Sequence, residues 1–146
     1  MASRLLTDAV PELQLKAPLI INDYQMQFPD RVLKVICTLR STQEQQALFF
    51  QGRTKVDGIH KFSKHNPDPI ELLAKAVDFG VFVGPTYITQ ESYYYPLLDL
   101  ARKYQLISGL DFFNTGVPLA ECLLHTYFKD PPHIEVPGPL YVPKVG

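Results

Sequence analysis

The sequence contains no tryptophan, only two cysteines and no long uninterrupted run of apolar residues. A helix that spans a bilayer needs about 20 consecutive apolar residues, so no membrane-inserted segment is expected. Cys37 and Cys122 lie far apart, form no CxxC pair and sit in apolar stretches, which favours two buried free thiols. A single disulfide between them is the alternative.

The chain also lacks an excess of charge of either sign. Fourteen Lys and Arg residues face fifteen Asp and Glu residues, for a formal net charge of -1, which excludes a broad electrostatic attraction to nucleic acid or anionic membranes. The first sixteen residues mix charged with apolar side chains and show no secretory signal, so we expect synthesis in the cytoplasm. An extracellular target would then be reached with outside help.

Nothing in the sequence divides the chain: it has no internal repeat, no low-complexity tract and no long linker. Its 146 residues, 46% hydrophobic and 20% charged, suffice for one folded domain with a hydrophobic core. We therefore expect one domain over 1–146. It would comprise an N-terminal helical segment at about 7–27, a core at about 32–136 and a proline-rich extended tail at 137–146.

Local patterns predict a mixed order of strands and helices. Strands are predicted where β-branched and other apolar residues cluster, at 32–39, 76–83 and 133–136. Helices are predicted at 7–27 (bent or split by Pro18), at 41–51 behind a capping box of Ser41 and Glu44, and at 91–104. This alternation with long loops indicates the α+β class.

Three residues draw attention as a possible metal site. Asp78 stands in the middle of an apolar strand, where a carboxylate is costly unless a cation or several donors meet it. His65 precedes this strand and His133 opens the last one. Two imidazoles and a carboxylate form a recognised catalytic zinc set, in which the metal lowers the pKa of a bound water to about 7. The alternative is a buried salt bridge at Asp78, and no HExxH helix is present.

The chain resembles a family of metallopeptidases in three blocks that occur in the family's order. Ser63-Lys64-His65 followed by Ala74 to Asp78 resembles the S-x-H-x-x-G-x-A-x-D signature of the D-alanyl-D-alanine and L-alanyl-D-glutamate metallopeptidases. Asp130 to His133 is similar to the family's D/E-x-x-H block. Leu39 to Arg53 is similar to its R-[ST]-x-x-E-Q-x-x-L-Y-x-x-G-R segment. The resemblance covers about Val32 to Val136.

This resemblance implies a hedgehog/DD-peptidase-like fold, with a small antiparallel-rich sheet flanked by helices. It also implies one zinc ion per chain, held by His65, Asp78 and His133. Asp130 matches the general base, and Arg40 matches the arginine that binds and polarises the substrate near the scissile carbonyl. Without the resemblance, an ordinary ion pair for Arg40 and a turn position for Asp130 explain both residues.

The sequence departs from the family pattern near the first histidine. The step from His65 to Asp78 is thirteen residues instead of the family's seven, with an insertion at 66–73 that contains Asp68 and Glu71. His60 is therefore the alternative ligand to His65. Ala74 replaces the signature's glycine, and Phe112 stands where the family has a tryptophan in G-L-x-W. His125 has no motif partner and is expected to be structural.

The implied activity is cleavage of bacterial peptidoglycan peptide stems, between L-alanine and D-glutamate. The expected context is a monomeric phage endolysin or wall hydrolase that acts after holin-type release or as a virion component. The alternatives are a D,D-carboxypeptidase or dipeptidase of the same fold, and a zinc-stabilised binding module without catalysis. The presence of both Asp130 and Arg40 argues against the last.

Overall fold

A computed structural model describes residues 2–40, 44, 46–47, 50–51, 64–66, 72–125 and 128–138. Its five-stranded sheet has the order β1-β2-β5-β4, with β3 also paired to β2, and every pairing is antiparallel. The strands are β1 (Val32–Cys37), β2 (Ala76–Val83), β3 (Thr86–Ile88), β4 (Ile107–Ser108) and β5 (His133–Glu135). The helical elements are η1 (Leu6–Asp8), α1 (Pro11–Gln27), η2 (Glu91–Tyr94), α3 (Pro96–Lys103) and α4 (Leu119–Cys122).

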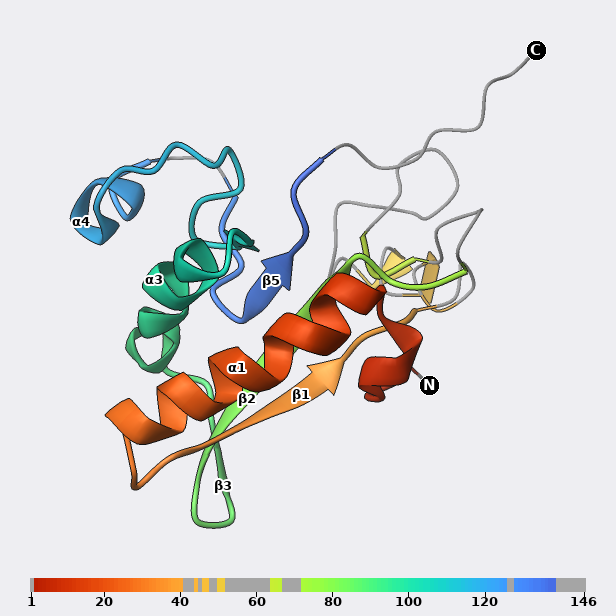
Figure 1. The fold of residues 1–146 in the computed structure, drawn as a ribbon. Coiled ribbons are helices and arrows are strands. Elements are labelled where there is room, and N and C mark those ends of the chain that lie inside the picture. The colour runs from red at the N-terminus through yellow and green to blue at the C-terminus, as the bar shows by residue number, and fades with distance from the viewer. Residues whose placement is uncertain are drawn as a thin grey trace.

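The α+β class and the antiparallel sheet flanked by helices are confirmed. Helix α1 runs along β1 and β2, and α3 lies beside α1 towards the β5 end of the sheet (Figure 1). The main core forms between these helices and the sheet, around Leu13, Tyr24, Phe79 and Leu97, all of which are buried. None of the described helices has the length and apolar character needed to cross a membrane.

The prediction that Pro18 bends or splits the first helix was wrong. The helix is continuous from Pro11 to Gln27 because Pro18 lies on its exposed side. Proline has no N–H, and on this side the backbone carbonyl left without its helical partner can bind water instead. Leu13, Ala17, Ile20 and Tyr24 are buried on the opposite side and hold both halves of the helix against the sheet. Leu15, expected on the apolar side, is 70% exposed.

The predicted strand at 76–83 is β2, and it is central as its composition indicated. Strand β1 pairs with one edge, and β5 and β3 pair in succession with the other. The register with β1 shifts between Val35 and Cys37, so that Cys37 lies opposite Asp78. Such a bulge redirects side chains, and here it brings Cys37 to the part of the sheet that carries Asp78.

The other predicted elements are found with adjusted ends. The helix expected at 91–104 is divided into η2 and α3 at Pro96, because proline occupies a first turn. Glu44, Gln46, Ala47 and Phe50 are helical, whereas Ser41 and Gly52, the expected ends of that helix, lie outside the described residues. Cys37 and Cys122 are both buried and free, as predicted.

A buried carboxylate organises the turn after β4. Asp111 accepts hydrogen bonds from the Thr115 hydroxyl, the backbone amides of Thr115 and Gly116, and the Arg102 guanidinium, at 2.9 to 3.1 Å. Burial by itself raises the pKa of Asp111, but these donors outweigh it and the pKa is lowered. Asp111 therefore has a structural role that the sequence did not reveal.

Candidate metal centre

Strand pairing brings two of the proposed ligands together from distant parts of the chain. In the register of β2 with β5, Asp78 lies directly opposite His133. The third, His65, comes from the segment 64–66, which is held by backbone hydrogen bonds to two other segments. The Arg40 amide donates to the His65 carbonyl at 2.7 Å, and the Lys75 amide donates to the Lys64 carbonyl at 2.7 Å. His65, Asp78 and His133 thus converge from three separate segments.

Three potential metal-ligand atoms, one from each of these residues, form a nearly equilateral triangle. His65 Nε2 lies 3.1 Å from Asp78 Oδ1 and 3.3 Å from His133 Nδ1, and His133 Nδ1 lies 3.2 Å from Asp78 Oδ1. In a tetrahedral site with bonds of about 2.0–2.1 Å, two ligand atoms stand about 3.3 Å apart. The triangle therefore has the dimensions of one face of a tetrahedral coordination sphere.

The opposite ring nitrogen of each histidine faces an acceptor. His65 Nδ1 lies 2.8 Å from the Thr38 carbonyl oxygen, and His133 Nε2 lies 2.9 Å from Glu135 Oε1. A carbonyl or carboxylate oxygen requires a donor, so these nitrogens carry a proton, and with a metal bound each ring would be neutral with its lone pair on the other nitrogen. The lone pairs of His65 Nε2 and His133 Nδ1 then point, with Asp78 Oδ1, into the same space. A single cation in this space would be bound by all three lone pairs.

The electrostatics of the three residues agree with this geometry. Burial by itself lowers the pKa of the His65 imidazole, but the Asp78 carboxylate outweighs it and raises the pKa to about 10. Burial would raise the pKa of Asp78, yet the two histidines hold it well below its ordinary value. Without a metal, the raised pKa favours a protonated His65 next to the ionised Asp78. A bound divalent cation would take the place of that proton and supply the positive charge.

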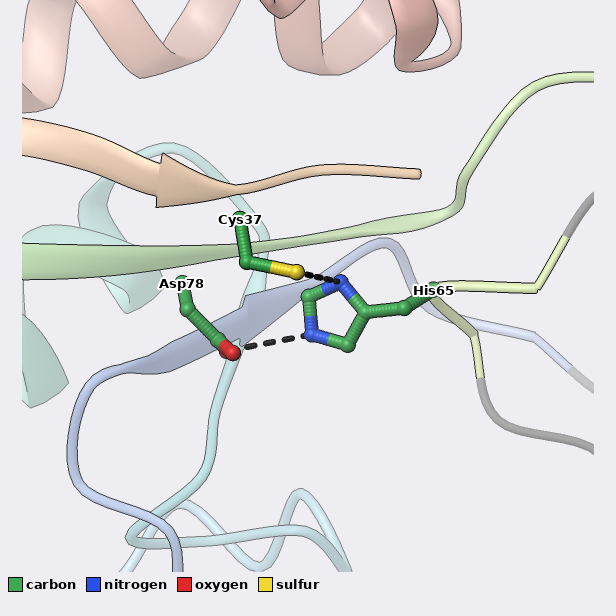
Figure 2. A group of neighbouring side chains, drawn as sticks. All are labelled: Cys37, His65 and Asp78. Carbon is green, nitrogen blue, oxygen red and sulfur yellow. Dashed lines mark hydrogen bonds and ion pairs between the residues drawn. The ribbon is translucent and has the colours of Figure 1, made fainter. Parts of the chain in front are cut away.

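The residues present consequently fit a metal ion. Two overlapping groups of potential ligands share Asp78: one adds Cys37 and His65, the other Asp130 and His133. Figure 2 shows that Cys37 Sγ approaches the ring nitrogen of His65 that faces away from Asp78, at 3.8 Å from Nδ1. Cys37 therefore lies behind His65, outside the triangle of converging lone pairs.

Asp130, which the resemblance matches to a general base, lies beside the triangle. Its Oδ2 is 3.9 Å from His133 Nδ1, and its side chain is 39% exposed, so solvent and a ligand can both reach it. Burial, followed by the charge of Asp78, raises the pKa of the Asp130 carboxyl. A carboxylate of raised pKa next to a metal centre is suited to accept and return a proton.

Arg40 is held close to the same residues. Its Nη2 lies 3.6 Å from Cys37 Sγ, and its backbone carbonyl accepts a hydrogen bond from the Asn66 side chain at 3.0 Å. Its charge reaches Asp130, where it opposes the rise in pKa. The backbone around Arg40 thus helps to fix His65, while the guanidinium adds positive charge near the centre.

Lys64 and Glu135 form an outer layer that the motif analysis did not recognise. Glu135 Oε2 pairs with Lys64 Nζ at 2.6 Å while Oε1 accepts from His133 Nε2. Lys64 Nζ also donates to the carbonyl oxygens of Val136 and Gly138, at 2.7 and 2.9 Å. Glu135 contacts the His133 ring nitrogen that faces away from Asp78 and therefore orients His133.

Replacing this carboxylate should weaken metal binding. Loss of an outer partner of a ligating histidine commonly costs about 10–100-fold in metal affinity. We expect that loss for Glu135→Gln, because the amide keeps the size of the side chain but removes the charge that polarises His133 and pairs with Lys64. Competition with a chromophoric chelator measures the affinity. Asp23→Asn is the control, since Asp23 pairs with Lys103 and Tyr104 at the surface. Equal affinities for both variants would contradict the role of Glu135.

Gly109 closes the turn that carries Asp130 and His133. Its amide donates to the His133 carbonyl at 2.7 Å, and its carbonyl accepts from the Asp130 amide at 2.9 Å. A Cβ atom at this position would lie 1.8 Å from the Asp130 carbonyl oxygen. The glycine of the Gly109-Leu110-Asp111-Phe112 segment, matched to the family's G-L-x-W, is thus required by close backbone approach.

The structure does not place every residue that was named from the sequence. His60, Asp68 and Glu71 lie outside the described residues, so the choice between His60 and His65 is supported only by the position of His65. His125 is exposed and belongs to neither ligand group. The ring of Phe112 lies 5.3 Å from that of His133 and forms an aromatic wall next to the centre.

Comparison with known proteins supports the fold. No family model and no curated protein sequence matches the chain. Among solved structures, the crystal structure of the Serratia marcescens L-Ala D-Glu endopeptidase ChiX is similar, with a TM-score of 0.60 and 18% sequence identity. The similarity covers 94% of this chain and 89% of that one. At this identity the likeness establishes a shared fold across nearly the whole length of both chains.

Proposed function

We propose that this protein is a zinc-dependent peptidase that cuts the peptides of bacterial peptidoglycan, with L-alanyl–D-glutamate as the bond cleaved. The observation that carries the proposal is the triangle of His65 Nε2, Asp78 Oδ1 and His133 Nδ1, with Asp130 beside it. The fold shared with an L-Ala D-Glu endopeptidase supports the choice of substrate. Two histidines and a carboxylate with an open fourth position are typical of catalytic zinc.

The chemistry divides between the metal and the protein. Zinc in such a site lowers the pKa of water to about 7 and polarises a carbonyl group. Asp130 takes a proton from the attacking water and delivers it to the leaving amine as the peptide C–N bond breaks. Arg40 binds near the scissile carbonyl and stabilises the negative charge that develops on its oxygen. Glu135 and the Thr38 carbonyl keep the two histidine rings in the required tautomers.

Digestion of purified peptidoglycan tests the activity. We expect new amino termini at glutamate, identified by mass spectrometry of the released fragments. Release of D-alanine alone would indicate the D,D-carboxypeptidase alternative, and release of D-alanyl-D-alanine the dipeptidase. New reducing sugar ends without new amino termini would contradict a peptidase. If the zinc-loaded protein binds the wall but releases nothing, the non-catalytic binding module is the better reading.

Metal analysis tests the ligands. The purified protein should contain about one equivalent of zinc, and His133→Ala should lose it because only two of the three converging donors remain. His65→Ala should also lose the metal, whereas His60→Ala should keep it. The opposite result for the two histidines would replace His65 with His60 in the proposed site.

A further inference from the structure

The edge of β2 that carries β5 and β3 has a gap between these two strands. Strand β5 pairs with Ala76 to Asp78, and β3 pairs with Val81 to Val83. Between them, the Phe79 amide donates to the Pro132 carbonyl at 3.0 Å, and neither strand pairs with Gly80 on this edge. The gap therefore begins immediately beyond the metal centre.

A cavity of about 170 Å³ is lined by Tyr87, Thr89, Glu91, Tyr94, Pro131 and Pro132. It borders the gap, because Pro132 binds the Phe79 amide and Tyr87 packs against Gly80. We call it the β2-edge pocket. Its two prolines join Asp130 to His133, so one wall of the pocket is continuous with the proposed catalytic residues. Gly80 and Asp78 point to the same face of β2, about 6.6 Å apart along the strand, which equals about two extended peptide residues.

The aromatic walls of the pocket are fixed by the packing around them. The Tyr94 hydroxyl accepts from the Val81 amide at 3.0 Å and donates to the Ile88 carbonyl at 2.5 Å, so its one donor is used and its ring is held in place. Tyr87 packs against Gly80, where an added Cβ would lie 3.1 Å from its ring. The Tyr87 side chain is still 45% exposed and can contact a ligand.

The lining combines apolar rings with one carboxylate. Prolines and tyrosines suit an aliphatic chain, and Glu91 with the face of Tyr87 suits a cationic head group. Glu91 is exposed and forms no ion pair with any residue in the described part of the chain. Lys34, a nearby cation on β1, lies over the ring of Phe82 and does not line the pocket.

We propose that the β2-edge pocket is a substrate subsite for a side chain that ends in an amine, such as that of the diamino acid in a wall peptide. This inference rests on the proposed function for its substrate. The aliphatic part of the side chain packs on Pro131 and Tyr87, and its ammonium group pairs with Glu91. Because Pro131 and Pro132 adjoin Asp130 and His133, this residue would lie one or two positions from the scissile bond.

The test compares two synthetic peptides, L-Ala-D-Glu-L-Lys and the same peptide with norleucine, which has the aliphatic chain without the amine. The parent protein should prefer the lysine peptide by about tenfold in kcat/KM. In Glu91→Gln this ratio should fall to near one. Asp99→Asn on α3, which removes an exposed carboxylate outside the pocket, should keep the ratio of the parent.

Calorimetric titration of both peptides into zinc-loaded Asp130→Asn protein separates binding from turnover. A preference for lysine that disappears with Glu91→Gln supports the subsite even if neither peptide is cut, in which case only the proposed reaction is wrong. Equal affinity for the two peptides, or a lysine preference that survives Glu91→Gln, overturns the subsite even if both peptides are cleaved.

Discussion

Asp130→Asn should lower the turnover of wall peptides by about 10²–10⁴-fold while the protein keeps its fold and its zinc. That range is the usual contribution of general acid–base assistance. The carboxylate lies 3.9 Å from His133 Nδ1, where it would reach a water held by a metal at the proposed site, and asparagine has the same shape but cannot accept the proton. The backbone bonds of Asp130 to Gly109 and His133 do not involve the side chain. Zinc content, melting temperature and hydrolysis should be measured on one preparation.

Asp111→Asn provides the matched control for this substitution. Asp111 is a buried aspartate that accepts four hydrogen bonds, so its loss should appear as a lower melting temperature. Asp130→Asn should show the reverse pattern, with a stable protein and little activity. Activity within a few-fold of the parent would remove Asp130 from the mechanism. Loss of zinc together with activity would instead make Asp130 a support of the metal site.

Gly109→Ala should destabilise the protein by about 3 kcal/mol or more, because the new methyl group would overlap the Asp130 carbonyl oxygen. For a chain of this length, that change corresponds to a fall in melting temperature of about 10 °C. The backbone must move to relieve the overlap, and both Asp130 and His133 lie on the segment that moves. We therefore expect weaker metal binding and lower activity along with the loss of stability.

Gly84→Ala is the comparison for Gly109→Ala. Gly84 has φ of +57° and no atom within 4 Å of an added Cβ, so alanine there meets backbone strain alone. Such strain costs about 1–2 kcal/mol, and Gly84 is in the turn between β2 and β3. The Gly84→Ala protein should bind metal with the same affinity as the parent. A larger fall in melting temperature for Gly84→Ala than for Gly109→Ala would show that the turn at Gly109 can yield.

Much of the secondary structure was predictable because it depends on neighbouring residues. The β-branched residues of Val32–Cys37 and the apolar run of Ala76–Val83 form strands where the pattern placed them. Pro18 was misjudged, since its cost depends on which side of the helix faces solvent, and that side is set by packing on the sheet. The break at Pro96 followed the ordinary preference of proline for a first turn.

The candidate ligands were recognisable from motifs, whereas the residues that support them were not. His65, Asp78, His133 and Asp130 occur in ordered blocks that resemble a family signature. Lys64 sits in the variable position of S-x-H, and it is joined to Glu135 across 71 positions of the chain by an ion pair. The choice between His60 and His65 could not be made from spacing, because the insertion at 66–73 alters the family's interval.

The sequence by itself determined the α+β class, strands β1, β2 and β5, helices α1 and α3, and a small set of residues able to bind a metal. Those features follow from local periodicity and side-chain chemistry, which act over a few residues. Only the tertiary structure decided that Asp78 faces His133, that a bulge in β1 brings Cys37 behind His65, and that Thr38 and Glu135 set the tautomers of the two rings. These arrangements depend on strand register and on acceptors contributed by other segments. The direction of a histidine lone pair is therefore set by contacts in space, which no local pattern contains.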